Sequence, residues 1–200
     1  MVSEPDFVAA RFPYAVLNNA LLWNLAALPR LREVYAGEPS YAVWTEVHDA
    51  PAAAALADAG FRREVTTLPM VCRLDKPVDE PLQSWSTVSS DAAPAQIAAL
   101  NGVPPALLEG VPGLRCYATI DGRSGLVAQD LDDAVVVSFV ATVPAARGQG
   151  LASMLTRRVL LDARSRAAAV AVLQATPMAE RIYQRLGFVP VGQWQEWVPA

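Results

Sequence analysis

The order of apolar and polar residues predicts three neighbouring strands in the second half of the chain. Segments of strand length, rich in β-branched and other apolar residues, occupy residues 114–120, 125–129 and 134–143. The dipeptide Asp121-Gly122 lies between the first two and is suited to a tight turn. The first two segments are therefore predicted to form a β-hairpin.

Helical and strand patterns alternate around these strands, as is typical of an α/β protein. Leu151, Met154, Leu155 and Val159 recur at helical spacing and form one apolar stripe. The other predicted elements are a strand at residues 85–88, a helix with Ser90 or Asp91 as its N-cap, a strand at residues 170–174, a helix that starts near Pro177 and ends at Gly187, and a final strand at residues 188–197.

The first 75 residues repeat part of this order. The predicted elements there are a strand at residues 41–45, a helix at residues 49–58, Gly60, and a strand at residues 64–74. We predict a partial, degenerate duplicate, in which residues 38–74 superpose on residues 168–198. The alternative is a coincidental strand-helix-strand with a glycine at the helix end.

A segment rich in proline and charge divides the chain. Residues 76–82 interrupt two regularly patterned stretches and are interpreted as a linker. The predicted domains are an N-terminal lobe over residues 1–75 and a second domain over residues 83–200. The net charge of −4 is unevenly placed, since residues 1–80 hold 7 basic and 11 acidic residues and residues 81–200 hold 9 of each.

Composition excludes several classes of protein. With 53% hydrophobic and 18% charged residues, the chain is predicted to be globular. A pI of 5.0 argues against binding to nucleic acid or to an anionic membrane. No apolar run reaches the roughly 18 residues of a membrane-spanning helix and the first residues are acidic, so a cytoplasmic protein is expected. Cys72, Cys116 and His48 lack ligand spacing, so no metal site is expected.

A glycine-containing turn at the start of a predicted helix is the segment that indicates a ligand-binding site. Its sequence is Arg147-Gly148-Gln149-Gly150-Leu151-Ala152. Glycines let backbone N–H groups approach a ligand closely, and a helix N-terminus carries partial positive charge, so the turn favours an anion such as a diphosphate. The spacing matches neither the P-loop nor the Gly-x-Gly-x-x-Gly motif.

This turn closely resembles the Arg/Gln-x-x-Gly-x-Gly/Ala signature of the GNAT superfamily of N-acetyltransferases. The resemblance covers residues 84–200 and includes the preceding residues 139–144 and the downstream residues 178–188. It implies a GNAT-like α/β fold, with a mixed, twisted sheet flanked by helices and, in this chain, a smaller α/β N-terminal lobe.

The resemblance also implies acetyl-CoA as cosubstrate, with no metal. In the family a tyrosine of the later helix commonly protonates the leaving thiolate, a position that Tyr183 occupies here. The cofactor-binding residues that the resemblance implies are Val140, Ala141 and Thr142 for the pantetheine arm, and Arg147, Gly148, Gln149, Gly150, Leu151, Ala152 and Ser153 for the diphosphate turn.

Two departures from the family pattern bear on mechanism. Thr176 stands where the family often has asparagine, so a side-chain contact to the pantetheine arm is replaced or absent. No carboxylate lies within residues 134–143, where many members place a general base. Deprotonation of the amine is then left to a water chain, to the backbone, or to acids elsewhere, of which the candidates are Glu109, Asp130 and Glu196.

The acceptor is left open between a small-molecule amine and a peptide amine, and a homodimer is one expected assembly. A non-catalytic acyl-CoA-binding or protein-interaction module is the alternative function. Trp194 and Trp197 either line the acceptor pocket or pack in the core. The arginines of the predicted helix either meet a CoA phosphate or are solvated, and the second interpretation is preferred; they are Arg157, Arg158, Arg164 and Arg166.

Overall fold

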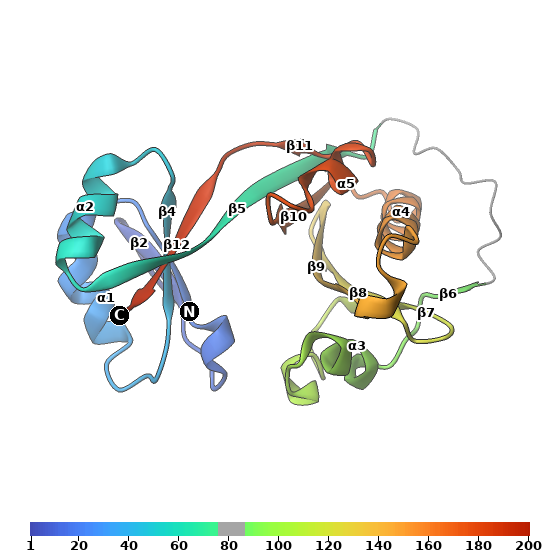
Figure 1. Cartoon of the computed structure of the whole chain (residues 1–200), viewed down its shortest axis with the longest axis horizontal. Coiled ribbons are helices and arrows are strands. Elements are labelled where there is room, and N and C mark those ends of the chain that lie inside the picture. The colour runs from blue at the N-terminus through green and yellow to red at the C-terminus, as the bar shows by residue number, and fades with distance from the viewer. Residues whose placement is uncertain (76–86) are drawn as a thin grey trace. The chain divides into compact units, whose positions relative to one another are not determined.

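The computed structural model describes residues 1–75 and 87–200, which form two compact units (Figure 1). The first unit comprises Met1–Pro69 and Gly192–Ala200, and the second comprises Met70–Val191. The predicted linker at residues 76–82 lies outside the described residues. The units divide the chain differently from the predicted domains, because the last strand of the chain belongs to the first unit.

The first unit contains one mixed sheet with the strand order β1-β2-β3-β4-β12-β5. β3 and β4 run parallel, and the other neighbours are antiparallel. The strands are β1 (Val2–Glu4), β2 (Phe7–Ala10), β3 (Asn19–Leu22), β4 (Ala42–Glu46), β5 (Phe61–Arg73) and β12 (Trp194–Pro199). The helices are α1 (Leu28–Val34), α2 (Ala50–Asp58) and short 3-10 turns at Ala15–Leu17 and Leu25–Ala27.

Buried apolar side chains from these elements form the core of the first unit. Phe7, Leu31, Val43 and Leu56 are fully buried in it. Trp197 is 2% exposed in the same core, and its indole N–H donates to Thr45 Oγ1 over 3.0 Å. Of the two interpretations of Trp197, the structure confirms core packing.

The second unit is built on a sheet in which β10 and β9 run parallel and β9, β8, β7 and β6 are successively antiparallel. The end of β5 pairs with β11 along one edge. The strands are β6 (Val88–Ser89), β7 (Leu114–Thr119), β8 (Ser124–Leu131), β9 (Ala134–Thr142), β10 (Val170–Ala175) and β11 (Val189–Pro190). The helices are α3 (Pro94–Asn101), α4 (Leu151–Ser165), α5 (Glu180–Gln184) and 3-10 turns at Pro105–Leu107 and Pro144–Ala146.

Helices α3 and α4 lie on opposite sides of β8 and β9 (Figure 1). The close approach of α3 depends on Gly125, because a Cβ there would lie 2.5 Å from Ile97 Cδ1 and 2.9 Å from Leu100 Cδ1. The absence of a side chain on this residue therefore lets α3 pack directly on β8.

The central predictions for this unit are confirmed, and three boundaries are wrong. The hairpin, the third strand and the long helix appear where the pattern placed them. Helix α3 has Ala93 rather than Ser90 or Asp91 as its N-cap, because Pro94 occupies the first helical turn. Helix α5 starts at Glu180, since residues 176–179 form a turn closed by Ala179 N–H and Thr176 C=O. The predicted last strand is two strands, β11 and β12.

Candidate functional site

The first feature of the site is a point where two parallel strands part. β10 pairs with β9 from Val170↔Ala134 to Leu173↔Val137. β9 continues to Thr142 without a β10 partner among the described residues, while β8 still pairs with its other edge as far as Ser124↔Thr142. Residues 138–142 therefore present one backbone edge that another extended chain can pair with.

A β-bulge lies at this point. Between the pairs Val127↔Ser138 and Gly125↔Ala141, β9 contains one residue more than β8. Phe139 adopts a φ of 51°, which is unusual for a residue with a side chain. The carbonyl of Phe139 accepts a hydrogen bond over 2.9 Å from Asn101 Nδ2, which also donates to the carbonyl of Ile97 over 2.9 Å. Asn101 therefore links the end of α3 to the bulge.

The glycine turn after β9 exposes a row of backbone donors. None of the amide N–H groups of residues 148–153 donates a hydrogen bond to another group within the described parts of the chain. The N-cap of α4 is Gly150, whose φ is 76° and which has no side chain to cap the helix. The first bond of the helix is donated by Met154 N–H to the carbonyl of Gly150 over 3.0 Å. These free donors and the helix dipole together favour an anion.

The geometry of the two glycines explains why the turn stays open. Gly148 has a φ of 77° and Gly150 a φ of 76°, a region that disfavours residues with a Cβ. A Cβ added to either would meet no atom within 4 Å, so both point into open space. The 3-10 turn at Leu25–Ala27 in the first unit differs, because Asn24 Oδ1 accepts from Ala26 N–H and so satisfies one of its donors.

The side chain of Arg147 turns back toward the strand. Its Nε donates to the carbonyl of Thr142 over 3.3 Å. Thr142 Oγ1 in turn lies 2.8 Å from the buried Ser124 hydroxyl, which also lies 3.0 Å from the carbonyl of Ala141. These contacts fix the end of β9 against β8.

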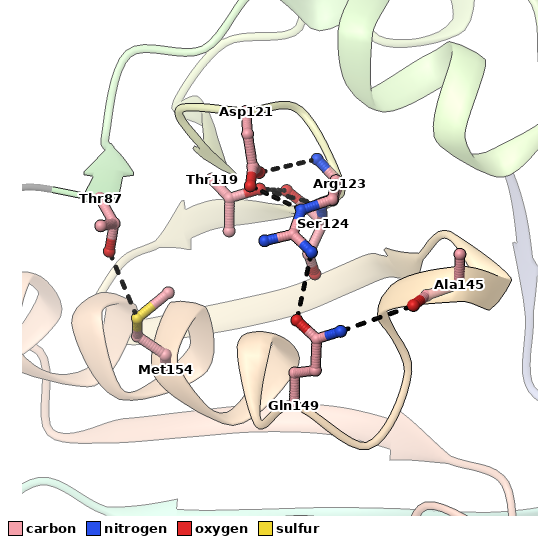
Figure 2. Close-up of polar contacts among 8 residues, drawn as sticks. All are labelled: Thr87, Thr119, Asp121, Arg123, Ser124, Ala145, Gln149 and Met154. Carbon is pink, nitrogen blue, oxygen red and sulfur yellow. Dashed lines mark hydrogen bonds and ion pairs between the residues drawn. The ribbon is translucent and has the colours of Figure 1, made fainter.

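A polar network joins the β7–β8 hairpin to the glycine turn (Figure 2). Arg123 Nε donates to Asp121 Oδ2 over 2.6 Å, and Arg123 Nη1 donates to Gln149 Oε1 over 3.1 Å. Asp121 accepts hydrogen bonds from Thr119, which has the larger effect, and from Arg123, and these bonds lower the pKa of its carboxyl. Arg123 is therefore held beside the turn by a charged partner.

Two hollows flank the turn, and each takes up part of the predicted site. Val140, Ala141, Thr142 and Arg147 line the first, which we call the β9 groove; its other lining residues are Gln96, Ala99, Leu100, Gly122, Val143 and Pro144. The second, which we call the hairpin hollow, contains Gln149, Gly150, Leu151 and Ser153; its other lining residues are Thr87, Thr119, Ile120, Asp121, Arg123, Met154 and Arg157. Gly148 and Ala152 line neither hollow.

Tyr183 lies on α5 and lines neither hollow. Its ring is 7% exposed and packs edge-to-face on Phe188 with centroids 5.9 Å apart. The hydroxyl of Tyr183 has no hydrogen-bond partner among the described residues. It is nevertheless in contact with solvent, because it is not one of the fully buried unpaired atoms. Burial raises the pKa of Tyr183, so the phenol keeps its proton at neutral pH.

The three candidate bases have different surroundings. Asp130 pairs with Arg166 over 2.8 Å and with Arg115 over 3.2 Å; burial opposes ionisation, but these two guanidiniums lower its pKa overall. It lies opposite Val135, about 20 Å along β9 from Thr142. The pKa of Glu196 is raised by burial, but this residue belongs to β12 in the first unit. Glu109 follows the 3-10 turn after α3.

The described parts of the chain contain neither a candidate metal site nor a disulfide. No group of three or more His, Cys, Asp or Glu side chains there is placed to hold a metal ion. Cys72 and Cys116 are buried free thiols that form no disulfide, and burial raises the pKa of both. Across residues 1–75 and 87–200, no helix is both long and apolar enough to cross a membrane.

Sequence comparison identifies the domain that carries the glycine turn. Residues 119–197 match the family model of the acetyltransferase (GNAT) domain. This part of the chain is therefore similar to a GNAT domain. No curated protein sequence matches the chain significantly.

Solved structures extend the GNAT similarity to the whole fold. A GCN5-related N-acetyltransferase from Kribbella flavida has a TM-score of 0.73 at 20% identity, over 99% of this chain and 88% of that one. A GNAT-family protein from Novosphingobium aromaticivorans has a TM-score of 0.65 at 22% identity, over 98% and 89%. A tandem GNAT protein from the clavulanic acid pathway has a TM-score of 0.55 at 12% identity, over 90% and 74%. The mixed, helix-flanked α/β sheet is thus the GNAT fold.

Sequence reasoning missed three side chains that shape the GNAT site. They are Asn101, which follows the apolar positions of the predicted helix, and Arg123 and Ser124, which lie between Gly122 and the predicted strand at residues 125–129. The sequence feature closest to this part of the site was the nearly continuous apolar run at residues 134–143, and such a run does not show where a β-bulge lies.

Proposed function

We propose that this GNAT protein is an N-acetyltransferase that transfers the acetyl group of acetyl-CoA to a primary amine by direct attack. One observation carries the proposal: the free amides of residues 148–153 follow directly on the unpaired edge of β9. A row of donors that favours a diphosphate, next to a strand edge that favours an extended amide-containing arm, matches the two halves of coenzyme A.

The residues present fit such a donor. The amides of the turn would bind the diphosphate, and the positive φ of Gly148 and Gly150 keeps Cβ atoms away from it. The backbone of Val140, Ala141 and Thr142 would pair with the pantetheine arm as a neighbouring strand does. The backbone N–H of Arg147 already donates to the carbonyl of Pro144 and its Nε to the carbonyl of Thr142, so only the two terminal guanidinium nitrogens of Arg147 would remain for the diphosphate.

Acetyl-CoA supplies a thioester, which an amine attacks at the carbonyl carbon. Backbone N–H groups at the bulge of β9 would polarise that carbonyl. As the new C–N bond forms and the C–S bond breaks, Tyr183 would donate its proton to the departing sulfur. The phenol is protonated at neutral pH, as this role requires, although burial raises its pKa and so makes it a weaker acid. The described lining of the β9 groove contains no carboxylate, so water would carry away the proton of the amine.

The second candidate is a module of GNAT fold that binds acyl-CoA or a protein without catalysis. The absence of a carboxylate from residues 134–143 favours it. Under this alternative the turn still binds CoA, but no acetyl group is transferred.

Titration calorimetry with CoA and a thiol-release assay with acetyl-CoA separate these candidates. We expect saturable CoA binding, thiol release that requires an added primary amine, and a mass increase of the amine equal to one acetyl group. The panel would contain small primary amines and a peptide with a free N-terminus. Binding without amine-dependent thiol release would support a non-catalytic module that binds acyl-CoA. No binding of CoA would contradict both the transferase and the acyl-CoA-binding module.

A further inference from the structure

The sheet of the first unit has two faces with different surroundings. Helices α1 and α2 pack on one of them (Figure 1), where Val43 and Trp197 are buried in the core. Successive residues of a strand point to opposite faces, so Trp44 and Glu196 lie on the other face. Both of these side chains are partly exposed. The second face therefore presents side chains that a ligand can reach.

Aromatic and acidic side chains alternate on this second face. Where β12 pairs with β4, Glu196 lies opposite Trp44 and Trp194 lies opposite Glu46. Directly opposed residues of neighbouring strands share a face, with Cβ atoms about 5 Å apart. Glu196 therefore has one indole as its neighbour across the strands, and the other, Trp194, lies two residues before it on its own strand. We call these four residues the Trp–Glu face.

The two carboxylates of the Trp–Glu face have no cationic partner among the described residues. Neither Glu46 nor Glu196 forms an ion pair there. Arg62 of the neighbouring β5 is paired with Glu64. Burial raises the pKa of Glu196; a hydrogen bond with the backbone of Val65 opposes this, and the charge of Glu64 adds to it. A partly desolvated carboxylate without a counter-charge is stabilised by a bound cation.

The net charge of the first unit favours a cation as well. Its two segments, Met1–Pro69 and Gly192–Ala200, contain five basic and nine acidic residues. Met70–Val191, the second unit, contains eleven basic and eleven acidic residues. The net charge of −4 thus belongs entirely to the unit that carries the Trp–Glu face, and it attracts cations.

We propose that the Trp–Glu face binds an organic cation, and that the acceptor is anchored there through an ammonium group other than the amine that reacts. The inference rests on the proposed function, because it names the class of acceptor: a primary amine with a second cationic group. An ammonium ion is attracted to the face of an indole ring, and a carboxylate beside it accepts charge-assisted hydrogen bonds. Trp44, Trp194 and Glu196 supply both kinds of contact. Leu21, partly exposed opposite Trp44, extends the apolar surface.

Titration calorimetry of the full chain, without CoA, tests the site directly. The probes are phenethylamine, which is a cation at neutral pH, and its neutral analogue 2-phenylethanol. We expect the wild type to bind phenethylamine about tenfold or more tightly than 2-phenylethanol, because only the cation pairs with Glu196. In Glu196→Gln the two affinities should become similar, and Trp194→Leu should weaken the binding of phenethylamine about fivefold. Equal affinity of the wild type for the two probes would overturn the inference and leave the proposed function standing.

Asp58→Asn is the matched control for charge. Asp58 is an exposed acid of α2, on the helical side of the same unit, so its loss removes the same negative charge without touching the Trp–Glu face. The preference for phenethylamine should stay at the wild-type value in this variant. An equal loss of preference in Asp58→Asn and Glu196→Gln would overturn the site, since the effect would then reflect net charge alone. Glu196→Gln keeps the shape of the side chain, so it decides the question where Trp194→Leu does not fold.

Acetyl transfer to α,ω-diamines and to monoamines of equal length tests the link to the acceptor. For at least one diamine of about four to eight carbons we expect a KM about tenfold below that of the matching monoamine, and Glu196→Gln should remove most of this difference. Diamines that are no better than monoamines would overturn the inference. A loss of kcat in Glu196→Gln at unchanged KM would also overturn it, because Glu196 would then act as a base rather than as an anchor. No transfer to any amine by a protein that binds phenethylamine would overturn the proposed function, and with it the anchoring of an acceptor.

Discussion

Asn101 donates a hydrogen bond from its side-chain amide to the carbonyl of Phe139, 2.9 Å away and 38 residues later in the chain. The bulge at Phe139 takes this carbonyl out of the regular ladder between β8 and β9. Asn101 supplies the missing donor, and it does so immediately before the residues proposed to bind the pantetheine arm. The side chain is therefore a positioning residue for the edge of β9.

Replacing Asn101 by Asp tests this role. A carboxylate of nearly the same shape cannot donate to Phe139, so the bulge and the amides that follow it should lose their orientation. We expect kcat to fall about tenfold, with the KM for acetyl-CoA changed much less, because misplacement of the reacting groups affects chemistry more than binding. Asn101→Gln, which keeps the amide donor, should retain more activity than Asn101→Asp. Equal kcat values for Asn101→Asp and the wild type would contradict the role.

Tyr183→Phe removes the proposed proton donor and leaves the packing against Phe188 in place. Turnover should fall by about 10²-fold, the usual scale for loss of a general acid, while the affinity for acetyl-CoA stays near the wild-type value. Steady-state kinetics combined with calorimetry would show this. Unchanged turnover would remove Tyr183 from the chemistry.

Gly150→Val places a branched side chain at a φ of 76°, where the wild type leaves the amides of the turn open. CoA affinity should fall by about two orders of magnitude, since several charge-assisted hydrogen bonds are lost together. Gly110→Val is the control, because Gly110 also has a positive φ, 71°, and open space at its Cβ position, but lies away from the turn. A similar loss of affinity in both variants would show that the effect is strain rather than ligand contact.

Thr156 and Thr119 are both buried threonines of the second unit, and their substitution by valine should have opposite effects. Thr156 Oγ1 has no hydrogen-bond partner among the described residues, so Thr156→Val should stabilise the protein by about 1 kcal/mol. Thr119 Oγ1 accepts from Ser124 N–H over 3.0 Å, so Thr119→Val should cost about 1–3 kcal/mol. Chemical denaturation at neutral pH measures both, and a loss of stability in Thr156→Val would contradict this assignment.

Stability should decrease at alkaline pH through Tyr117. Desolvation by burial, followed by the charge of Asp162, raises the pKa of this phenol to about 12 in the folded protein. The unfolded chain ionises near pH 10, so the contribution is fully present below that pH and is lost as the pH rises toward 12. The free energy of unfolding should fall less steeply between pH 10 and 12 in Tyr117→Phe than in the wild type, as followed by denaturant titration. Identical slopes would show that Tyr117 does not contribute.

Much of the second unit could be predicted from local sequence. The hairpin at Asp121-Gly122 and the helix after Gly150 depend on turn chemistry and on apolar spacing between near neighbours, and both appear in the structure. The glycine turn could be located for the same reason, because its glycines and its free amides belong to one short segment. The partial duplication of the N-terminal lobe stays a prediction, although β3 and β4 run parallel as β9 and β10 do.

The sequence by itself thus determined the elements whose contacts lie close along the chain, and with them the proposed anion site. Only the tertiary structure decided which distant segments meet. Trp197 packs in the first unit through Thr45, 152 residues away, and Gln149 meets Arg123 across 26 residues. Strand patterns of similar composition allow many pairings and registers, and the choice among them depends on the packing of the whole unit rather than on any local signal.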